Sequence, residues 1–145
     1  TMEQPQYNLL DRKRFEIEYK PIFEKYGMGT TTWSPLASGS LTGKYLEGIP
    51  EGSRASLEGY EWLKNSMVDS ERGKDRMKKV ASLVPIANEM GVNLSNLAIA
   101  WCLLNENVST VILGALKIEQ LEENLKSTEV LSLFDEGILN KLSAI

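Results

Sequence analysis

The sequence predicts an α/β fold in which short strands end in loops of small residues and continue into helices. Two β-branched runs carry this prediction, residues 29–34 and residues 109–113. The first run enters a Ser/Gly loop that closes with Lys44, and the second enters Gly114 and Ala115 ahead of a helical segment. Because the chain between the runs has helical periodicity, we expect parallel neighbouring strands joined by helices. A third, weaker strand candidate lies at the N-terminus.

The segment before the first run has the apolar pattern of a helix. Asp11 is expected to cap this helix, and Gly27 is expected to end it. Pro21 lacks a backbone N–H, so the helix should kink or break near Lys20. The apolar residues of one helix face are Phe15, Tyr19, Ile22, Phe23 and Tyr26.

Two further helices are predicted between the strands. Residues 72–90 have helical periodicity and stop at Gly91, with Met77, Val80, Val84 and Ala87 aligned on one face. Residues 94–104 are apolar on most sides, which is typical of a helix buried by its neighbours, and Asn93 is a candidate cap. Before them, the polar, Gly- and Pro-containing residues 48–56 are expected to leave the strand ends as a long loop, a candidate lid or clamp.

The C-terminal part is predicted to be helical. Ile118, Leu121 and Leu125 follow the second strand at helical spacing, and we expect them to form the inward face of a helix. Residues 134–145 have the pattern of one more short amphipathic helix.

Composition is that of an ordinary globular, cytoplasmic protein. Of the 145 residues, 25% are charged and 42% are hydrophobic, and the formal net charge of −4 disfavours a nucleic-acid-binding role. Cys102 is the single cysteine, and its apolar surroundings favour a buried small side chain over a reactive thiol. The sequence has no histidine and no zinc-ligand spacing, so no metal site is expected.

The Ser/Gly loop after the first strand is the best candidate for a ligand site. Trp33 offers a stacking face, and the small residues that follow let backbone N–H groups approach phosphate oxygens. Lys44 is a cation that could close over such a phosphate. The structural alternatives are a packing role for Trp33 and solvated surface charges for Lys44 and Arg54.

Several motifs resemble those of the aldo-keto reductases, and most closely the branch of voltage-gated potassium channel β-subunits. The matching stretches are E-Q-P-Q-Y-N (residues 3–8), T-W-S-P-L-A-S-G (32–39), L-T-G-K-Y (41–45), G-I-P-E-G-S-R (48–54), L-A-I-A-W-C-L (97–103) and the G-A-x₄-Q-L-x-x-N pattern (114–124). They span nearly the whole chain in the family's order.

The resemblance implies a (β/α)₈ TIM barrel, and a complete barrel of this kind needs about 250 residues. We therefore expect residues 1–145 to be the C-terminal part of a single barrel domain, namely its last three strand–helix units. The alternative is a small free-standing α/β domain.

The resemblance also implies an NADP(H) site. Trp33 would stack on the nicotinamide ring, and Gln4 would hydrogen-bond the carboxamide, to which an amide offers both donor and acceptor. The pyrophosphate cradle would consist of Ser34, Pro35, Leu36, Ala37 and Ser38, with Lys44 and Arg54 as its cations.

The adenosine end of the site would come from the segment after the second strand. Its residues would be Gly114, Leu116, Gln120, Glu123 and Asn124. By this resemblance Glu123 and Asn124 lie near adenine, and Gln120 lies near the 2′-phosphate. A solvated helix charge is the alternative for Glu123.

Two positions depart from the family pattern. Leu116 stands where relatives tend to have a hydroxyl residue, and Gly52 stands where channel β-subunits carry an aromatic residue. Both leave the preference between NADP and NAD open. The family's catalytic Tyr, Lys and Asp come from earlier strands, and no residue of this chain matches them.

Two functions follow as expectations. The first is an NADP(H)-dependent oxidoreductase that transfers hydride between nicotinamide and a small aldehyde or ketone. The alternative is a regulatory β-subunit, expected to be a homo-oligomer, that binds the cytoplasmic domain of a potassium channel and senses redox state with slow or no turnover. A third outcome is that this chain by itself has no activity.

Overall fold

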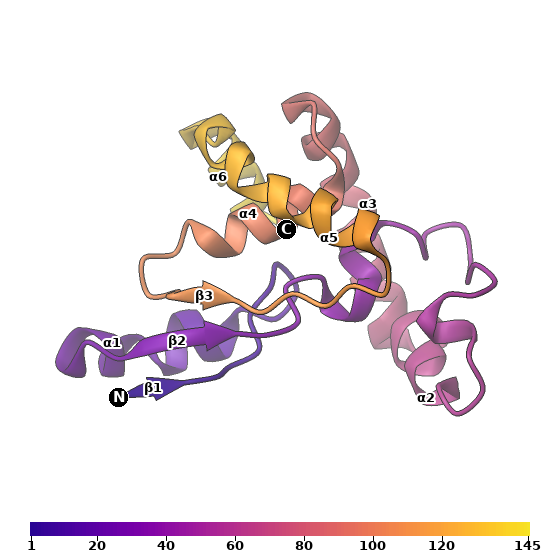
Figure 1. Cartoon of the computed structure of the whole chain (residues 1–145), viewed down its shortest axis with the longest axis horizontal. Coiled ribbons are helices and arrows are strands. Elements are labelled where there is room, and N and C mark those ends of the chain that lie inside the picture. The colour runs from indigo at the N-terminus through magenta and orange to yellow at the C-terminus, as the bar shows by residue number, and fades with distance from the viewer.

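The computed structural model describes residues 1–145, apart from the side chain of Val68. In this described part, three short strands form a parallel sheet in the order β1-β2-β3: β1 (Met2–Glu3), β2 (Gly29–Thr32) and β3 (Thr110–Val111). Glu3 pairs with Thr30, and Thr32 pairs with Val111. Figure 1 shows the three strands pointing the same way. The predicted parallel pairing of the two β-branched runs is confirmed, although both strands are shorter than the runs.

The connection from β1 to β2 contains two short helices. A π-helical turn, η1 (Arg14–Glu18), is followed by α1 (Lys20–Tyr26), and the break between them lies at Tyr19. The predicted break next to Pro21 is therefore confirmed. Gly27 ends α1 with a left-handed φ of 58°, as expected for a residue without a Cβ.

The prediction that Asp11 caps this helix is wrong. Lys13 occupies the N-cap position and makes no side-chain cap hydrogen bond. The Asp11 carboxylate instead accepts two hydrogen bonds from Arg76, each at 2.8 Å. Arg76 lies 65 positions away in sequence, so the local capping pattern could not indicate this pairing.

The connection from β2 to β3 is mostly helical. It comprises η2 (Ala37–Thr42), η3 (Arg54–Ser56), α2 (Glu61–Lys64), η4 (Asn65–Asp69), α3 (Glu71–Met90) and α4 (Leu94–Leu103). Ser70 caps α3 by accepting from the Gly73 N–H, and Asn93 caps α4 by accepting from the Asn96 N–H. The two long predicted helices, the stop at Gly91 and the Asn93 cap are confirmed.

Buried side chains from the N-terminal segment, η1, α3 and α4 form the main core. The Tyr7 and Phe15 rings stack with centroids 4.2 Å apart, and Trp101 lies 5.0 Å from the Tyr7 ring. Cys102 is fully buried, its thiol donates to the Tyr7 carbonyl at 3.6 Å, and burial raises its pKa to about 12. The prediction that Cys102 is a small core side chain is confirmed.

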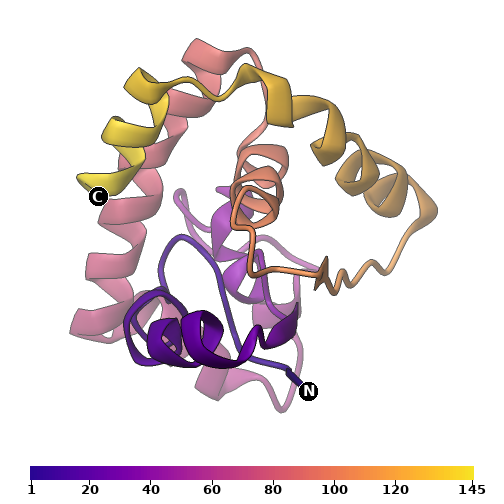
Figure 2. The same cartoon turned by 90° about the vertical axis from the view of Figure 1, so that its left-hand side faces the viewer.

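Three helices follow β3: α5 (Ile118–Leu125), η5 (Lys126–Leu133) and α6 (Glu136–Ser143). Asp135 caps α6, which confirms the predicted short C-terminal helix. In Figure 2, α6 lies along α3, where Lys141 pairs with Glu89 at 2.6 Å.

The predicted inward face of α5 is wrong. Ile118, Leu121 and Leu125 are 73%, 43% and 58% exposed, whereas the buried residue of the helix is Asn124. The polar side of α5 faces α4, because Glu123 accepts hydrogen bonds from Asn93 and Asn96. No segment among the described residues covers the apolar side.

None of the described helices has the length and apolar character needed to cross a membrane. The described residues also contain no cluster of three or more His, Cys, Asp or Glu side chains suited to hold a metal ion.

Candidate functional site

The loops after β2 and β3 leave the sheet at the carboxyl ends of the parallel strands. Figure 1 shows the two loops at the same end of the sheet, with α5 starting beyond β3. In barrel proteins, this end of the strands carries the binding loops. The candidate residues Trp33, Ser34, Gly114 and Leu116 all lie in these two loops.

The structure brings Trp33 and Gln4 together. The indole Nε1 of Trp33 donates to the Gln4 backbone carbonyl at 3.1 Å, and the Trp33 N–H donates to the Pro5 carbonyl at 3.1 Å. Trp33 is nevertheless 43% exposed. An indole held at its edge but open to solvent is available for stacking against a planar ligand.

The loop after Trp33 has an unusual backbone. Ser34, Ala37 and Ser38 have left-handed φ values of 58°, 48° and 57°, and Gly39 has 95°. Left-handed backbone costs a residue with a Cβ of order 1 kcal/mol or more, and such residues concentrate at ligand sites.

Three backbone N–H groups of this loop are bonded within the loop. The Ala37 N–H donates to the Ser34 carbonyl at 3.0 Å, the Ser38 N–H donates to the Ser34 Oγ at 3.3 Å, and the Gly39 N–H donates to the Leu36 carbonyl at 2.9 Å. The loop is therefore held in its left-handed shape by its own hydrogen bonds. Within the loop, Pro35 is buried and Leu36 is partly buried.

Lys44 lies against this loop. A Cβ added to Gly39 would be 3.2 Å from the Lys44 Cε and 3.3 Å from its Nζ. The Nζ atom is also 5.0 Å from the centroid of the Tyr45 ring. Gly39 therefore serves two needs, a left-handed φ and room for an ammonium group over the loop.

Arg54 begins the short helix η3. Its side chain is exposed, and its guanidinium carbon lies 5.1 Å from the centroid of the Tyr60 ring. The next residue, Ala55, belongs to a small buried cluster with Tyr45, Leu63 and Met67. This cluster joins the loop of residues 48–56 to the segment that carries Lys44.

The adenosine-end candidates have structural partners of their own. The Gln120 Oε1 accepts from the Leu116 N–H at 3.0 Å, although the Leu116 side chain is 89% exposed. The Glu123 carboxylate accepts from Lys126 and Asn93, each at 2.7 Å. The hydrogen bond from Lys126 is the main cause of the lowered pKa of Glu123. Glu123 therefore ties α5 to the start of α4.

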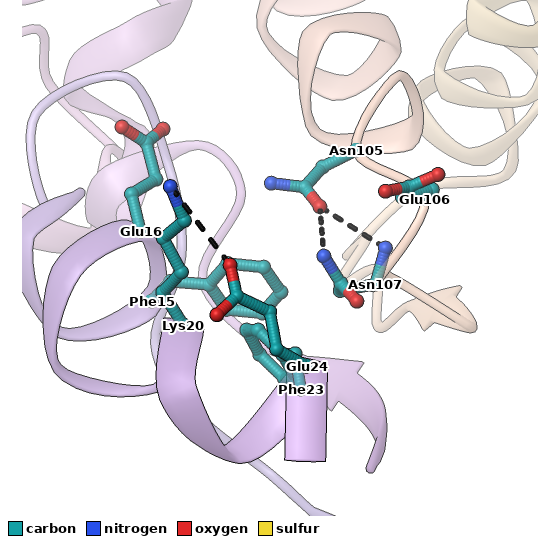
Figure 3. Close-up of a pocket in the computed structure, with 8 residues that line it drawn as sticks. All are labelled: Phe15, Glu16, Lys20, Phe23, Glu24, Asn105, Glu106 and Asn107. Atoms are coloured by element: carbon teal, nitrogen blue, oxygen red, sulfur yellow. Dashed lines mark hydrogen bonds and ion pairs between the residues drawn. The ribbon is translucent and has the colours of Figure 1, made fainter. Parts of the chain in front are cut away.

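A cavity of about 770 Å³ lies beside Trp33 and Gln4. It is bounded by the loop after β1 and by α3, which contributes Arg72 and Lys79. A second cavity, of about 340 Å³, lies between α1 and the turn that precedes β3, at the opposite ends of the strands (Figure 3). Neither of these two cavities is lined by Arg54 or Asn124.

The ion pair between Asp11 and Arg76 supports the wall of the larger cavity. Gln6 also donates to the Asp11 carboxylate, at 3.1 Å. Burial would raise the pKa of Asp11, but the hydrogen bonds and charge of Arg76 outweigh burial and hold the pKa below its usual value of 3.8. Local sequence patterns do not indicate this role, because the pairing depends on a contact between segments that are distant in the sequence.

We expect Asp11→Asn to lower the free energy of unfolding at neutral pH by about 1–3 kcal/mol, because Arg76 loses a charged partner in a mostly buried place. A carboxyl group whose pKa is lowered by folding stabilises the folded state at pH values above its unfolded pKa. This stabilisation is lost as the pH falls through the folded pKa. The wild type should therefore lose stability below about pH 4, and the variant should lose less over the same range.

The measurement is urea unfolding at a series of pH values. Asp75→Asn is the matched control, since the Asp75–Lys78 pair is largely exposed and should contribute little. If the free energies of unfolding of the wild type and of Asp11→Asn changed in parallel with pH, the ion pair between Asp11 and Arg76 would not stabilise the folded state.

Comparison with known proteins decides the family. The model of the Aldo/keto reductase family matches residues 1–142. The chain belongs to the aldo/keto reductase family. This family has a (β/α)₈ barrel, and the small parallel sheet with its connecting helices is consistent with part of one.

Two plant proteins are similar to this aldo/keto reductase chain over almost its whole length. It is 51% identical to a protein from Oryza sativa subsp. japonica and 49% identical to one from Arabidopsis thaliana, each over 146 aligned residues. Both relatives are described as a probable voltage-gated potassium channel subunit beta. The alignments cover 99% of this chain but only 43% of each relative, so the chain spans less than half of their length.

Proposed function

We propose that this chain contributes the cofactor half of an NADP(H)-dependent oxidoreductase, a cytoplasmic protein that transfers hydride between nicotinamide and a small aldehyde or ketone. The main support is the hydrogen bond from the Trp33 indole to the Gln4 backbone carbonyl. Trp33 is followed by a left-handed loop, and Lys44 lies over this loop. We also propose that residues 1–145 are the last three strand–helix units of one barrel domain. Membership of the family and the 43% coverage of its relatives support this.

The residues present fit such a cofactor. An exposed indole suits the nicotinamide ring, the amide of the exposed Gln4 suits the carboxamide, and the left-handed loop with Lys44 suits a pyrophosphate. Arg54 would approach the phosphates from the neighbouring loop. The adenosine would lie against α5, with contacts from Gly114, Leu116, Gln120, Glu123 and Asn124.

The cofactor and the protein would have separate roles in the reaction. The cofactor supplies the hydride when bound, and the protein orients the ring and excludes water around it. Trp33 would fix one face of the ring, so that the other face remains open to the carbonyl carbon. Gln4 would fix its rotation. The proton for the carbonyl oxygen would come from the family's tyrosine, for which this chain has no match.

Titration of the intact protein with NADPH and with NADH tests this proposal. We expect NADPH to bind, and the ratio of its affinity to that of NADH measures the contribution of the 2′-phosphate, since a hydrogen bond to such a charged group contributes about 1.5–3 kcal/mol. NADPH should also be oxidised when a small aldehyde is added. The proposal would be contradicted if neither NADPH nor NADH bound to the intact protein.

A second function is favoured by the descriptions of the two plant relatives. In this alternative the protein is a regulatory subunit, a homo-oligomer that binds the cytoplasmic domain of a potassium channel and turns over slowly or not at all. Co-purification with such a domain, together with NADPH binding and no measurable aldehyde reduction, would support it. Rapid turnover without co-purification would support the enzyme instead.

A further inference from the structure

Asn8 is a polar residue buried to 0% exposure at the end of the N-terminal segment. Both the nitrogen and the oxygen of its side-chain amide are hydrogen-bonded. The Nδ2 group donates to the Ser34 carbonyl at 3.0 Å, while the Oδ1 atom accepts from the N–H groups of Leu10 and Asp11, each at 2.9 Å. The oxygen faces two donors and the nitrogen faces an acceptor, so the amide fits in one orientation only.

Asn8 holds the carbonyl of Ser34, the first residue of the left-handed loop. Ser34 follows Trp33 directly and has a φ of 58°. Its carbonyl accepts from both the Asn8 Nδ2 and the Ala37 N–H, and its Oγ accepts from the Ser38 N–H. Rotation of the peptide after Ser34 would break two hydrogen bonds at once. It would also release the negative end of a carbonyl dipole from a buried donor.

Asn8 is itself anchored to the helical layer. The turn that its Oδ1 closes contains Asp11, whose carboxylate is held by the two hydrogen bonds from Arg76 on α3. A continuous chain of hydrogen bonds therefore runs from α3 through Asp11 and Asn8 to Ser34. This connection gives a strained loop a rigid support, which preorganises a binding site.

We propose that Asn8 is a positioning residue for the cofactor's diphosphate. By holding the Ser34 carbonyl, Asn8 keeps that carbonyl from turning toward the phosphate oxygens and keeps the loop of residues 34–39 in its left-handed shape beneath Lys44. Asn8 itself does not contact the cofactor. The inference rests on the proposed function, because it assumes that the loop of residues 34–39 receives the diphosphate.

The test variant is Asn8→Asp in the intact protein. Aspartate keeps the shape and the acceptor for Leu10 and Asp11 but replaces the donor to Ser34 with a negative oxygen. Asn105→Asp is the matched control. The Asn105 Nδ2 donates to the Tyr7 hydroxyl at 3.2 Å and its Oδ1 accepts from the Asn107 N–H at 3.0 Å, at the other end of the strands (Figure 3). Asn8→Ala serves as a second variant should the added charge prevent folding.

Two measurements decide the matter. In the cofactor-free protein, Asn8→Asp should shift the backbone amide resonances of Ser34 and of residues 36–39 and the indole Nε1–H resonance of Trp33, whereas Asn105→Asp should leave them in place. In NADPH titrations, Asn8→Asp should raise Kd about tenfold or more, and Asn105→Asp should change it by less than about twofold.

The proposal is overturned if Asn8→Asp and Asn8→Ala leave both readouts unchanged, or if Asn105→Asp changes them equally, which would indicate a general loss of stability. Absence of NADPH binding by the wild type would overturn the proposed function and the diphosphate role with it. The resonances would then still show whether Asn8 fixes the loop.

Discussion

Trp33→Ala should weaken NADPH binding to the intact protein by about tenfold or more. Stacking of a planar base on an aromatic side chain contributes about 1–3 kcal/mol, and alanine removes the whole stacking face. Because Trp33 is 43% exposed and lies outside the main core, the unfolding transition should move little. A loss of affinity with an unchanged unfolding curve would therefore report on the ligand rather than on the fold.

The measurement is a titration that follows NADPH fluorescence. Trp62→Ala is the matched control, since Trp62 is 60% exposed in α2 and has no proposed cofactor contact. An unchanged NADPH dissociation constant for Trp33→Ala would mean that this tryptophan is only a packing residue.

The second large effect concerns the chain of residues 1–145 made on its own. It should self-associate, and it should not oxidise NADPH in the presence of an aldehyde. The apolar side of α5 exposes Ile118, Leu121 and Leu125, and burial of such side chains contributes about 1.5–3 kcal/mol each. The outer strands β1 and β3 are each paired on one side within the described sheet, and unpaired strand edges recruit other chains.

Light scattering with and without the double variant Ile118→Lys, Leu121→Lys measures this association. The variant should shift the population strongly toward monomer, because two charges on the apolar side oppose its burial. Ile17→Lys is the control, since Ile17 is 65% exposed on η1, far from α5 in sequence. A monodisperse wild-type monomer with measurable turnover would contradict both halves of this expectation.

Local rules predicted much of the fold. Gly27 and Gly91 end helices because a left-handed φ suits glycine, and Asn93 begins α4 because its side chain accepts from the N–H of Asn96 three residues later. The parallel pairing of β2 and β3 followed from the helical connection between them. Each of these features depends on residues that are close together in the sequence or on a general rule of chain topology.

The errors lie where distant segments meet. Asp11 looked like a helix cap but pairs with Arg76, and the apolar side of α5 looked inward but is exposed. Periodicity shows that a helix has an apolar side, but not which segment covers it. Within the candidate site, the contact between Trp33 and Gln4 and the place of Lys44 beside Gly39 required the structure. The proposed roles of these residues depend on their resemblance to a family.

Hydrogen–deuterium exchange of the intact protein, with and without NADPH, tests the central claim most directly. If the loops after β2 and β3 form one cofactor site, NADPH should slow exchange in residues 33–44 and in residues 114–124 together. Exchange near the cavity of Figure 3 should not change. NADPH binding that protects neither loop, or that protects only segments outside them, would contradict the account.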